Sequence, residues 1–230
     1  MSFKYSEAVP WGRSFDEYCR MFGLSEQDLK LRIIGCGDGP ASFNAEMFEI
    51  GHRVVSCDPL YQLTMAQIQE RIDVTYENVM RQTYENQHNF LWTRIKSPEE
   101  LGKARLAAMR MFLADFASGK RDGRYVTAEL PDIPFQSDSY DLAVCSHFLF
   151  LYSDILSLEF HQRAIEEMCR VAHEARIFPL MNYNAKPSPF VKPLLKLLTD
   201  AGYNTSIETV PYEFQRGGHQ MLRVRKVGSA

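Results

Sequence analysis

Short runs of β-branched and other apolar residues alternate along this chain with longer segments of helical periodicity. This alternation indicates repeated strand–helix–strand units, which build a mostly parallel sheet with helices on its faces. It constrains the fold more than any other feature, because parallel neighbours need a long crossover between them. Seven segments have the composition of strands: 31–34, 53–57, 124–129, 140–146, 176–182, 205–210 and 220–225.

The last two predicted strands differ from the others in how they are joined. The loop between them contains Gly217 and Gly218 and shows no helical pattern, so these strands are expected to pair antiparallel. The sequence therefore predicts an α/β fold with a Rossmann-like, doubly wound, seven-stranded sheet whose last strand is antiparallel.

A long segment, 62–123, separates the second and third predicted strands. Neighbouring parallel strands are usually joined by a few residues and one helix. This segment is therefore predicted to be a helical insertion within a single domain that spans 1–230. Apolar residues recur at helical spacing in two stretches of it, 65–79 and 106–116, which predicts two amphipathic helices.

The second of these helices carries signals for both of its ends. Ser97, Pro98 and Glu100 combine a capping serine, a proline in the first turn and the glutamate of a capping box. The helix is expected to stop before Gly119. We expect the two helices to cover the substrate side of the site, with their apolar stripes used mainly for packing.

Composition and charge exclude several classes of protein. The 230 residues are 45% hydrophobic and 24% charged, which is typical of a globular protein. The net charge of −3, without a stripe of lysine and arginine, does not favour nucleic acid as substrate. Segment 1–7 lacks the features of a signal peptide and no apolar run approaches membrane-spanning length, so a cytoplasmic protein without membrane association is expected. The five cysteines are scattered and the histidines share no ligand spacing, so no disulfide or metal site is expected.

The strongest local signal is a glycine-rich turn between the first predicted strand and a helix. Gly35, Gly37 and Gly39 lie within the sequence LRIIGCGDGP at 31–40. Because glycine has no Cβ atom, such a turn lets a ligand lie against bare peptide groups at the start of a helix. We predict that these three glycines bind a nucleotide-like cofactor.

An acidic residue follows the glycines at the distance expected for a ribose ligand. Asp58 ends the second predicted strand about twenty residues further on, where a carboxylate can accept hydrogen bonds from a ribose diol. Its place before Pro59 is equally compatible with a turn residue. A nicotinamide dinucleotide site usually has a third glycine in G-x-G-x-x-G, but that position holds Pro40. The turn therefore does not favour NAD.

From its first predicted strand to the C-terminus, apart from the insertion, the chain resembles class I S-adenosylmethionine-dependent methyltransferases. Three further segments carry the resemblance: 129–135 after the third strand, 139–144 at the fourth strand and 167–171 in the helix before the fifth. The resemblance implies S-adenosylmethionine as cofactor and the strand order 3-2-1-4-5-7-6. It also implies that Glu129 and the backbone of Leu130 contact the adenine.

The chain departs from this family at the start of the glycine turn. An acidic residue usually stands two positions before the first glycine and helps to hold the amino group of the methionine moiety, but this chain has Ile33. Backbone carbonyls near Gly35 are an alternative, and Arg13 is a candidate partner for the carboxylate. A solvated arginine at a helix start is the alternative role of Arg13. An aspartate inside the glycine turn, here Asp38, resembles the turn of aminopropyltransferases. The aspartates that these enzymes have after the fourth strand are missing from this chain.

The segment after the fourth predicted strand bears on the reaction. Residues 145–150 lack the Asn-Pro-Pro-Tyr-like and Pro-Cys motifs of nucleobase methylation, which favours a small-molecule acceptor. A sulfonium methyl group is already activated, so the transfer needs aligned reactants and at most one base. His147 is the candidate base, and packing beside Phe148 is its alternative role. Weaker candidates after strands are Tyr152, Asn182 and Tyr183.

The sequence thus predicts a cytoplasmic S-adenosylmethionine-dependent methyltransferase that acts on an unidentified small molecule. Two alternatives stay open. One is a protein that binds the cofactor as a sensor or scaffold without transferring a methyl group. The other is an aminopropyltransferase-like enzyme, which would prefer the decarboxylated cofactor. Neither nucleic acid nor a membrane is expected as partner, and no oligomeric state is predicted.

Overall fold

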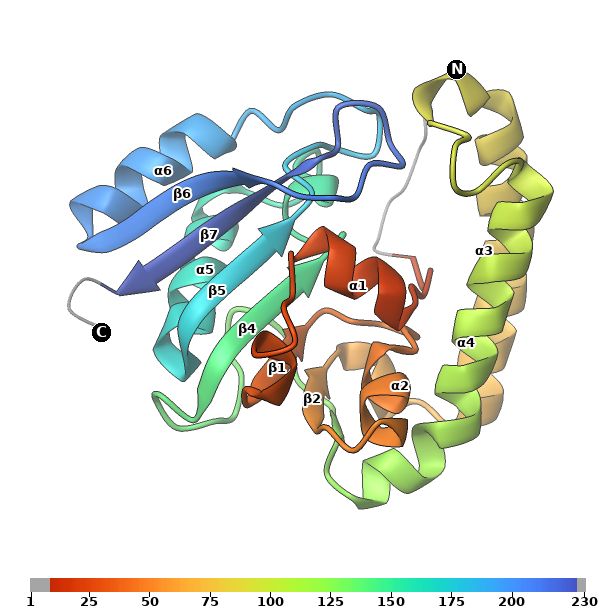
Figure 1. Cartoon of the computed structure of the whole chain (residues 1–230), viewed down its shortest axis with the longest axis horizontal. Coiled ribbons are helices and arrows are strands. Elements are labelled where there is room, and N and C mark those ends of the chain that lie inside the picture. Colours follow the sequence, from red (N-terminus) through yellow and green to blue (C-terminus); the bar gives the residue numbers. More distant parts are fainter. Residues whose placement is uncertain (1–8, 227–230) are drawn as a thin grey trace.

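The computed structural model describes residues 9–226, which form one seven-stranded sheet between helices (Figure 1). The strand order is β3-β2-β1-β4-β5-β7-β6, and β7 pairs antiparallel with both β5 and β6 while the other pairs are parallel. The predicted fold class and strand order are confirmed. Of the predicted domain, 1–8 and 227–230 lie outside the described part. The strands are β1 (Ile33–Cys36), β2 (Val54–Cys57), β3 (Tyr125–Val126), β4 (Tyr140–Ser146), β5 (Ala172–Phe178), β6 (Tyr203–Thr209) and β7 (Gln220–Lys226).

Helices cover both faces of the sheet, as a doubly wound fold requires. Successive residues of β1 point to opposite faces: Ile33 packs in a cluster with α1 and α2, and Ile34 in a cluster with α5 and α6. Burial on both faces explains why the central strands are continuous apolar runs. The helices are α1 (Phe15–Met21), α2 (Phe43–Glu49), α3 (Met65–Glu85), α4 (Pro98–Arg121), α5 (Leu158–Val171) and α6 (Val191–Asp200).

The prediction for the fifth strand was wrong at both ends. β5 starts at Ala172, immediately after α5, rather than at 176, and it ends at Phe178. The polar run before 176 forms a strand because the buried carboxylate of Glu174 accepts hydrogen bonds from arginines on β5 and β7. Pairing of this kind offsets the cost of burying the charge. These arginines are Arg176, Arg223 and Arg225.

The insertion forms two long helices, α3 and α4, which lie side by side at one end of the sheet (Figure 1). Ser97 caps α4 as predicted and accepts a hydrogen bond from the backbone of Glu100. The predicted capping box is not formed, because the carboxylate of Glu100 accepts the backbone N–H of Lys96 at 2.8 Å instead of that of Ser97. The predicted stop before Gly119 is wrong, because α4 continues to Arg121. A Cβ atom on Gly119 would lie 2.4 Å from the ring of Tyr125. This glycine therefore allows β3 to pack closely against α4 and does not end the helix.

Candidate active site

The glycine turn leads from β1 into α2 and forms one wall of a cavity. Gly37 and Gly39 have φ angles of +74° and +53°, in the left-handed region that favours glycine. A Cβ atom on Gly37 would lie 3.2 Å from the ring of Phe148, so a side chain there would crowd the cavity wall. Gly37 and Gly39 both line the cavity, and their binding of a cofactor stays a prediction.

Gly35 has a different role from the predicted one, because it does not line the cavity. A Cβ atom on Gly35 would lie 1.8 Å from Oδ2 of Asp38, so this glycine makes room for that carboxylate. The hydroxyls of Tyr18 and Ser56 donate to Asp38 at 2.8 Å and 2.6 Å. Burial raises the pKa of Asp38 to about 6. The turn thus holds a buried carboxyl group next to the cavity.

Asp58 is a turn residue and also faces the cavity, so its two predicted roles do not exclude each other. Its Oδ1 accepts the backbone N–H of Leu60 at 2.7 Å, and its Oδ2 accepts that of Gly39 at 2.8 Å. Each carboxylate oxygen has a second lone pair, which leaves acceptor capacity for a ligand. Burial, together with the negative charge of Glu129, raises the pKa of Asp58 to about 6 against the effect of these hydrogen bonds.

The cavity beside the glycine turn, here called the outer cavity, has a volume of about 580 Å³. It lies at the carboxyl ends of the central strands, where open α/β sheets bind ligands. The exposed Glu129 and the buried Leu130 both line it, and they approach it from the loop after β3. The outer cavity is lined by residues 9–11, Arg13, Tyr18, 37–40, 58–60, Gln62, Arg71, 128–131, 146–148, Tyr152, Leu156 and Phe160.

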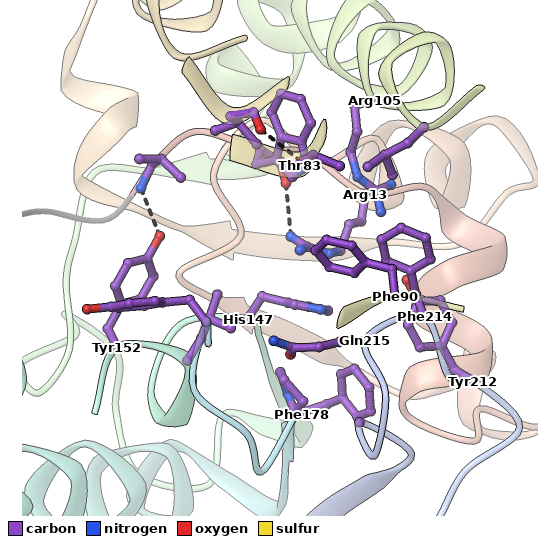
Figure 2. A pocket seen from close by; sticks show the side chains of 18 residues that line it. Arg13, Thr83, Phe90, Arg105, His147, Tyr152, Phe178, Tyr212, Phe214 and Gln215 are labelled. Carbon is purple, nitrogen blue, oxygen red and sulfur yellow. Dashed lines mark hydrogen bonds between the residues drawn. The ribbon is translucent and has the colours of Figure 1, made fainter. Parts of the chain in front are cut away.

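A second cavity, here called the inner cavity, has a volume of about 110 Å³, and Figure 2 shows the side chains that line it. Its walls come from the N-terminal stretch, both insertion helices, the loops after β4 and β5 and the loop between β6 and β7. Most of its lining side chains are aromatic or aliphatic. It is lined by Val9, Trp11, Arg13, Val79, Thr83, Phe90, Leu101, Arg105, His147, Leu151, Tyr152, Phe178, Pro179, Tyr183, Tyr212, Phe214, Gln215 and Gly218.

The two cavities adjoin, since the same five residues line both of them. These are Val9, Trp11, Arg13, His147 and Tyr152. The backbone N–H of Val9 donates to the hydroxyl of Tyr152 at 3.0 Å, which ties the N-terminal stretch to the loop after β4. A group in the outer cavity therefore meets a group in the inner cavity at this shared wall.

His147 is held in the shared wall by its backbone as well as by its ring. Its φ angle is +52°, and its N–H donates to the carbonyl of Phe178 at 2.6 Å. Its Nδ1 lies 3.0 Å from the hydroxyl of Ser146, which in turn lies 3.9 Å from the sulfur of Met21. Where Ser146 donates to Met21, Nδ1 of His147 carries the proton, so Nε2 is left as an acceptor.

The surroundings of His147 keep its ring neutral. Burial lowers its pKa well below the usual range, and the positive charges of Arg13 and Arg105 act in the same direction. Figure 2 shows the His147 ring between Tyr152 on one side and Gln215 and Phe178 on the other. A neutral imidazole at this position can accept a proton from a molecule in the inner cavity.

A buried ion pair borders the inner cavity. The two terminal nitrogens of Arg105 donate to the two carboxylate oxygens of Glu17, one of them at 2.7 Å, and the hydroxyl of Tyr212 donates to the same carboxylate at 2.9 Å. Arg105 is 1% exposed and Glu17 is 6% exposed. Although burial acts in the opposite direction, Arg105 lowers the pKa of Glu17 to about 2.

Arg13 lies between the two cavities, which does not favour the solvated alternative. Its Nη1 donates to the carbonyl of Trp11 at 2.9 Å. Its Nε is buried and has no hydrogen-bond partner within residues 9–226, and the same holds for Nε of Arg105. The predicted contact of Arg13 with the methionine carboxylate stays a prediction.

Other predicted residues are divided between the cavities and their surroundings. Tyr152 and Tyr183 line the inner cavity. Asn182 does not, because its side chain contacts Asp154 and its carbonyl accepts from Gln215. Within residues 9–226 no cluster of three or more histidine, cysteine, aspartate or glutamate side chains suits a metal ion. No helix in this range has both the length and the apolar character needed to span a bilayer.

The two residues of the buried ion pair, and Tyr212 that donates to it, were not predicted from the sequence. Glu17 and Arg105 are 88 positions apart, and Tyr212 is more distant still. Glu17 has the pattern of a capping box with Ser14, which it also forms, so its sequence context indicates only a helix start. Arg105 lies on the apolar face of α4, four positions before Met109 and seven before Phe112. A charged residue at this spacing is the signal that could have indicated a buried ion pair, although it does not identify the partner.

Comparison with solved structures gives methyltransferases at low sequence identity. A methyltransferase of Thermotoga maritima, described as a possible histamine N-methyltransferase, is 13% identical, with 92% of this chain and 88% of that chain covered and a TM-score of 0.46. A TehB-like methyltransferase of Corynebacterium glutamicum is 15% identical, with 86% and 80% covered and a TM-score of 0.45. Magnesium protoporphyrin IX methyltransferase of Synechocystis, solved with bound S-adenosylmethionine, is 15% identical, with 92% and 90% covered and a TM-score of 0.41. Such likenesses say nothing of this chain's substrate.

No protein-family profile matches the chain. A relative in sequence is the uncharacterized protein MJ0045 of Methanocaldococcus jannaschii, which is 34% identical over 223 residues, with 96% of this chain and 97% of the relative covered. The observed strand order, with β7 antiparallel, is the one that the resemblance to class I methyltransferases implies. The chain therefore has the class I methyltransferase fold and belongs to the same family as MJ0045.

Proposed function

We propose that this chain is an S-adenosylmethionine-dependent methyltransferase that acts on a small molecule. One observation carries the proposal: a cavity at the glycine turn adjoins a second cavity at a wall that contains His147. Methyl transfer needs a donor and an acceptor held in line, with at most one base beside the acceptor to take its proton. The two adjoining cavities and the neutral histidine meet these needs.

The outer cavity fits the cofactor by its donor and acceptor groups. Asp58 keeps acceptor capacity for two ribose hydroxyls, and the bare peptide groups at Gly37 and Gly39 permit close approach. Asp38 supplies a carboxyl group near the place where the family usually has an acid and this chain has Ile33. When bound, S-adenosylmethionine supplies an activated methyl group.

The chain's own contribution to the reaction would be positioning and one proton transfer. The aromatic walls of the inner cavity exclude water and hold the acceptor, since ligand cavities of this kind are mostly apolar with a few placed polar groups. Nε2 of His147 then takes a proton from the acceptor atom. An acceptor that carries no proton at that atom would not need this step.

Thermal unfolding with added ligands tests the proposal. S-adenosylmethionine and S-adenosylhomocysteine should raise the melting temperature, because a ligand at 100 times its Kd adds about 2.7 kcal/mol to the stability of the native state. NAD should have no effect. Stabilisation by NAD alone would contradict the proposal, and preference for the decarboxylated cofactor would favour the aminopropyltransferase alternative.

Turnover separates an enzyme from a sensor or scaffold. Incubation of S-adenosylmethionine with a pool of cell metabolites should produce S-adenosylhomocysteine in amounts that depend on the protein. Tight cofactor binding without any such product would favour a binding protein that does not transfer methyl groups.

A further inference from the structure

The inner cavity carries more positive than negative charge. Arg13 and Arg105 line it, and none of its lining residues within 9–226 is an aspartate or a glutamate. Arg105 engages both carboxylate oxygens of Glu17, which does not line the cavity. Within residues 9–226, the other cation is left without an ion pair to a carboxylate.

Arg13 is that cation. Its guanidinium donates to a neutral carbonyl, that of Trp11, whereas Arg105 has a full carboxylate partner. Burial lowers the pKa of Arg13 to about 10, and the positive charge of Arg105 adds to this effect, although Glu17 opposes it. The side chain of Arg13 is half-buried, and its enclosed Nε has no hydrogen-bond partner within residues 9–226. A partly desolvated cation without an ionic partner in this range favours an anionic ligand.

The rest of the inner cavity indicates what the anion is attached to. Seven of its lining side chains are aromatic, and its volume of about 110 Å³ is small. Aromatic walls favour flat apolar bodies, with edge-to-face or offset packing. The aromatic side chains are those of Trp11, Phe90, Tyr152, Phe178, Tyr183, Tyr212 and Phe214.

We propose that the methyl acceptor is a small aromatic carboxylate, with its carboxylate at Arg13 and its ring among these aromatic side chains. That this ligand accepts a methyl group rests on the proposed function. That an aromatic carboxylate binds at this place does not depend on it. The guanidinium of Arg13 suits a carboxylate because its planar N–H groups can form paired hydrogen bonds. His147, in the same wall, lies where it can take a proton from a hydroxyl or amino group on the ring.

The carboxylate of the cofactor's methionine moiety is the other source of the same chemistry, since Arg13 also lines the outer cavity. The charges that line the two cavities favour the carboxylate of the acceptor as the ligand of Arg13. The outer cavity is lined by three carboxyl groups, those of Asp38, Asp58 and Glu129. The inner cavity is lined by no carboxyl group within residues 9–226, and the charge of Arg105 there is balanced by Glu17. An anion is therefore favoured on the inner side of Arg13.

Calorimetric titration with three aromatic acids tests the inference. The probes are benzoate, 4-hydroxybenzoate and phenylacetate, each compared with its own primary amide, which has the same shape without the charge. At least one acid should bind the wild-type protein about tenfold or more tightly than its amide, a difference of ~1.4 kcal/mol. Equal binding of acids and amides, or no binding of any acid at millimolar concentration, would overturn the inference.

Variants locate the carboxylate. Arg13→Gln should weaken acid binding about tenfold or more and leave amide binding unchanged, while Arg13→Lys, which keeps the charge, should fall between it and wild type. Arg32→Gln is the matched control, because it removes one positive charge from an exposed ion pair. Arg32 pairs with Asp141 at the amino ends of β1 and β4, away from both cavities. This variant should bind the acids like wild type. Circular dichroism checks that each variant is folded.

Repeating the titrations with saturating S-adenosylhomocysteine separates the two carboxylates. Acid binding that persists, together with S-adenosylhomocysteine affinity that Arg13→Gln leaves unchanged, supports the inner site. Loss of acid binding, with a matching loss of S-adenosylhomocysteine affinity in Arg13→Gln, would assign Arg13 to the cofactor and overturn the inference. Failure of S-adenosylhomocysteine to bind the wild-type protein at all would instead contradict the proposed function, whatever the acids do.

Discussion

The two cavities share a wall but differ in charge. The outer cavity is lined by three carboxyl groups, with Arg13 and the exposed Arg71 as its cations, whereas the inner cavity is lined by two arginines and by no carboxyl group within residues 9–226. The sulfonium and the amino group of the proposed cofactor are positive, and the proposed acceptor is negative. The comparison teaches that the wall at His147 would bring opposite charges together, so each reactant would favour the binding of the other.

The largest expected effect concerns the shared wall itself. His147→Asn removes the candidate base, and asparagine tolerates the left-handed φ of +52° at this position. The rate of S-adenosylhomocysteine formation with an accepted substrate should fall by about 100- to 10,000-fold. The Kd of S-adenosylhomocysteine should stay the same. An equal rate in the variant would show that His147 packs in the wall and takes no proton.

The next effect concerns the stability of the inner cavity. Arg105→Met leaves the carboxylate of Glu17 buried with Tyr212 and without a cation, which should lower the free energy of unfolding by about 3–5 kcal/mol. The matched control is Arg32→Met, whose pair with Asp141 is exposed and should cost less than about 1 kcal/mol. Urea denaturation measures both.

A double variant sharpens this result. Glu17→Leu combined with Arg105→Met removes both charges, and it should recover much of the stability, since apolar replacements of buried pairs are often neutral. A loss in Arg105→Met as small as that in the control would mean that water reaches the pair and that the inner cavity is not a low-dielectric site.

A smaller effect is expected in the outer cavity. Asp58→Ala should weaken S-adenosylhomocysteine binding by roughly ten- to several-hundredfold, because hydrogen bonds to charged groups are worth about 1.5–3 kcal/mol each. Asp58→Asn keeps one acceptor oxygen, so its affinity for S-adenosylhomocysteine should lie between those of the wild-type protein and Asp58→Ala. Because Asp58 also holds the turn at Leu60 and Gly39, the alanine variant should melt lower as well. Wild-type affinity in a variant that melts lower would restrict Asp58 to the turn.

The smallest effect is a dependence of cofactor affinity on pH. The pKa of Asp58 in the ligand-free chain is raised to about 6, and the ionised form is the better acceptor for hydroxyl groups. Affinity for S-adenosylhomocysteine should therefore be highest above this pH and fall by at most about tenfold per unit below it. Asp38 has a similar pKa. Asp58→Asn separates the two, because any slope that remains in this variant belongs to Asp38.

The outer half of the site was largely predictable from the sequence because its parts are close in the chain and follow strands. Gly37, Gly39 and Asp58 stand at the ends of two neighbouring strands, and strand ends are where an α/β sheet places its ligands. Gly35 was assigned the wrong role since no sequence pattern shows that the side chain of Asp38 folds back onto it. Short-range patterns thus identify the site but not each residue's contact.

The inner half could not be predicted, since its walls come from segments far apart in the chain. The pairing of Glu17 with Arg105 depends on how α1 and α4 pack against each other. No residue next to either of them in the sequence identifies the partner. The start of β5 was missed for the same reason, because the arginines that neutralise Glu174 lie partly on β7. Long-range ion pairs are decided by tertiary structure, which local periodicity does not contain.

The antiparallel direction of β7 has a practical consequence for handling the protein. Its last residue, Lys226, pairs with Tyr203 at the start of β6, and Arg225 pairs with Glu174 near the start of β5. The strand therefore ends at the amino ends of β5 and β6, whereas both cavities lie at the carboxyl ends of the parallel strands. Val9, by contrast, lines both cavities. In the sequence, only eight residues separate a purification tag fused before residue 1 from Val9 at the two cavities. A tag fused after residue 230 keeps that place clear, and it is the better choice for every titration described above.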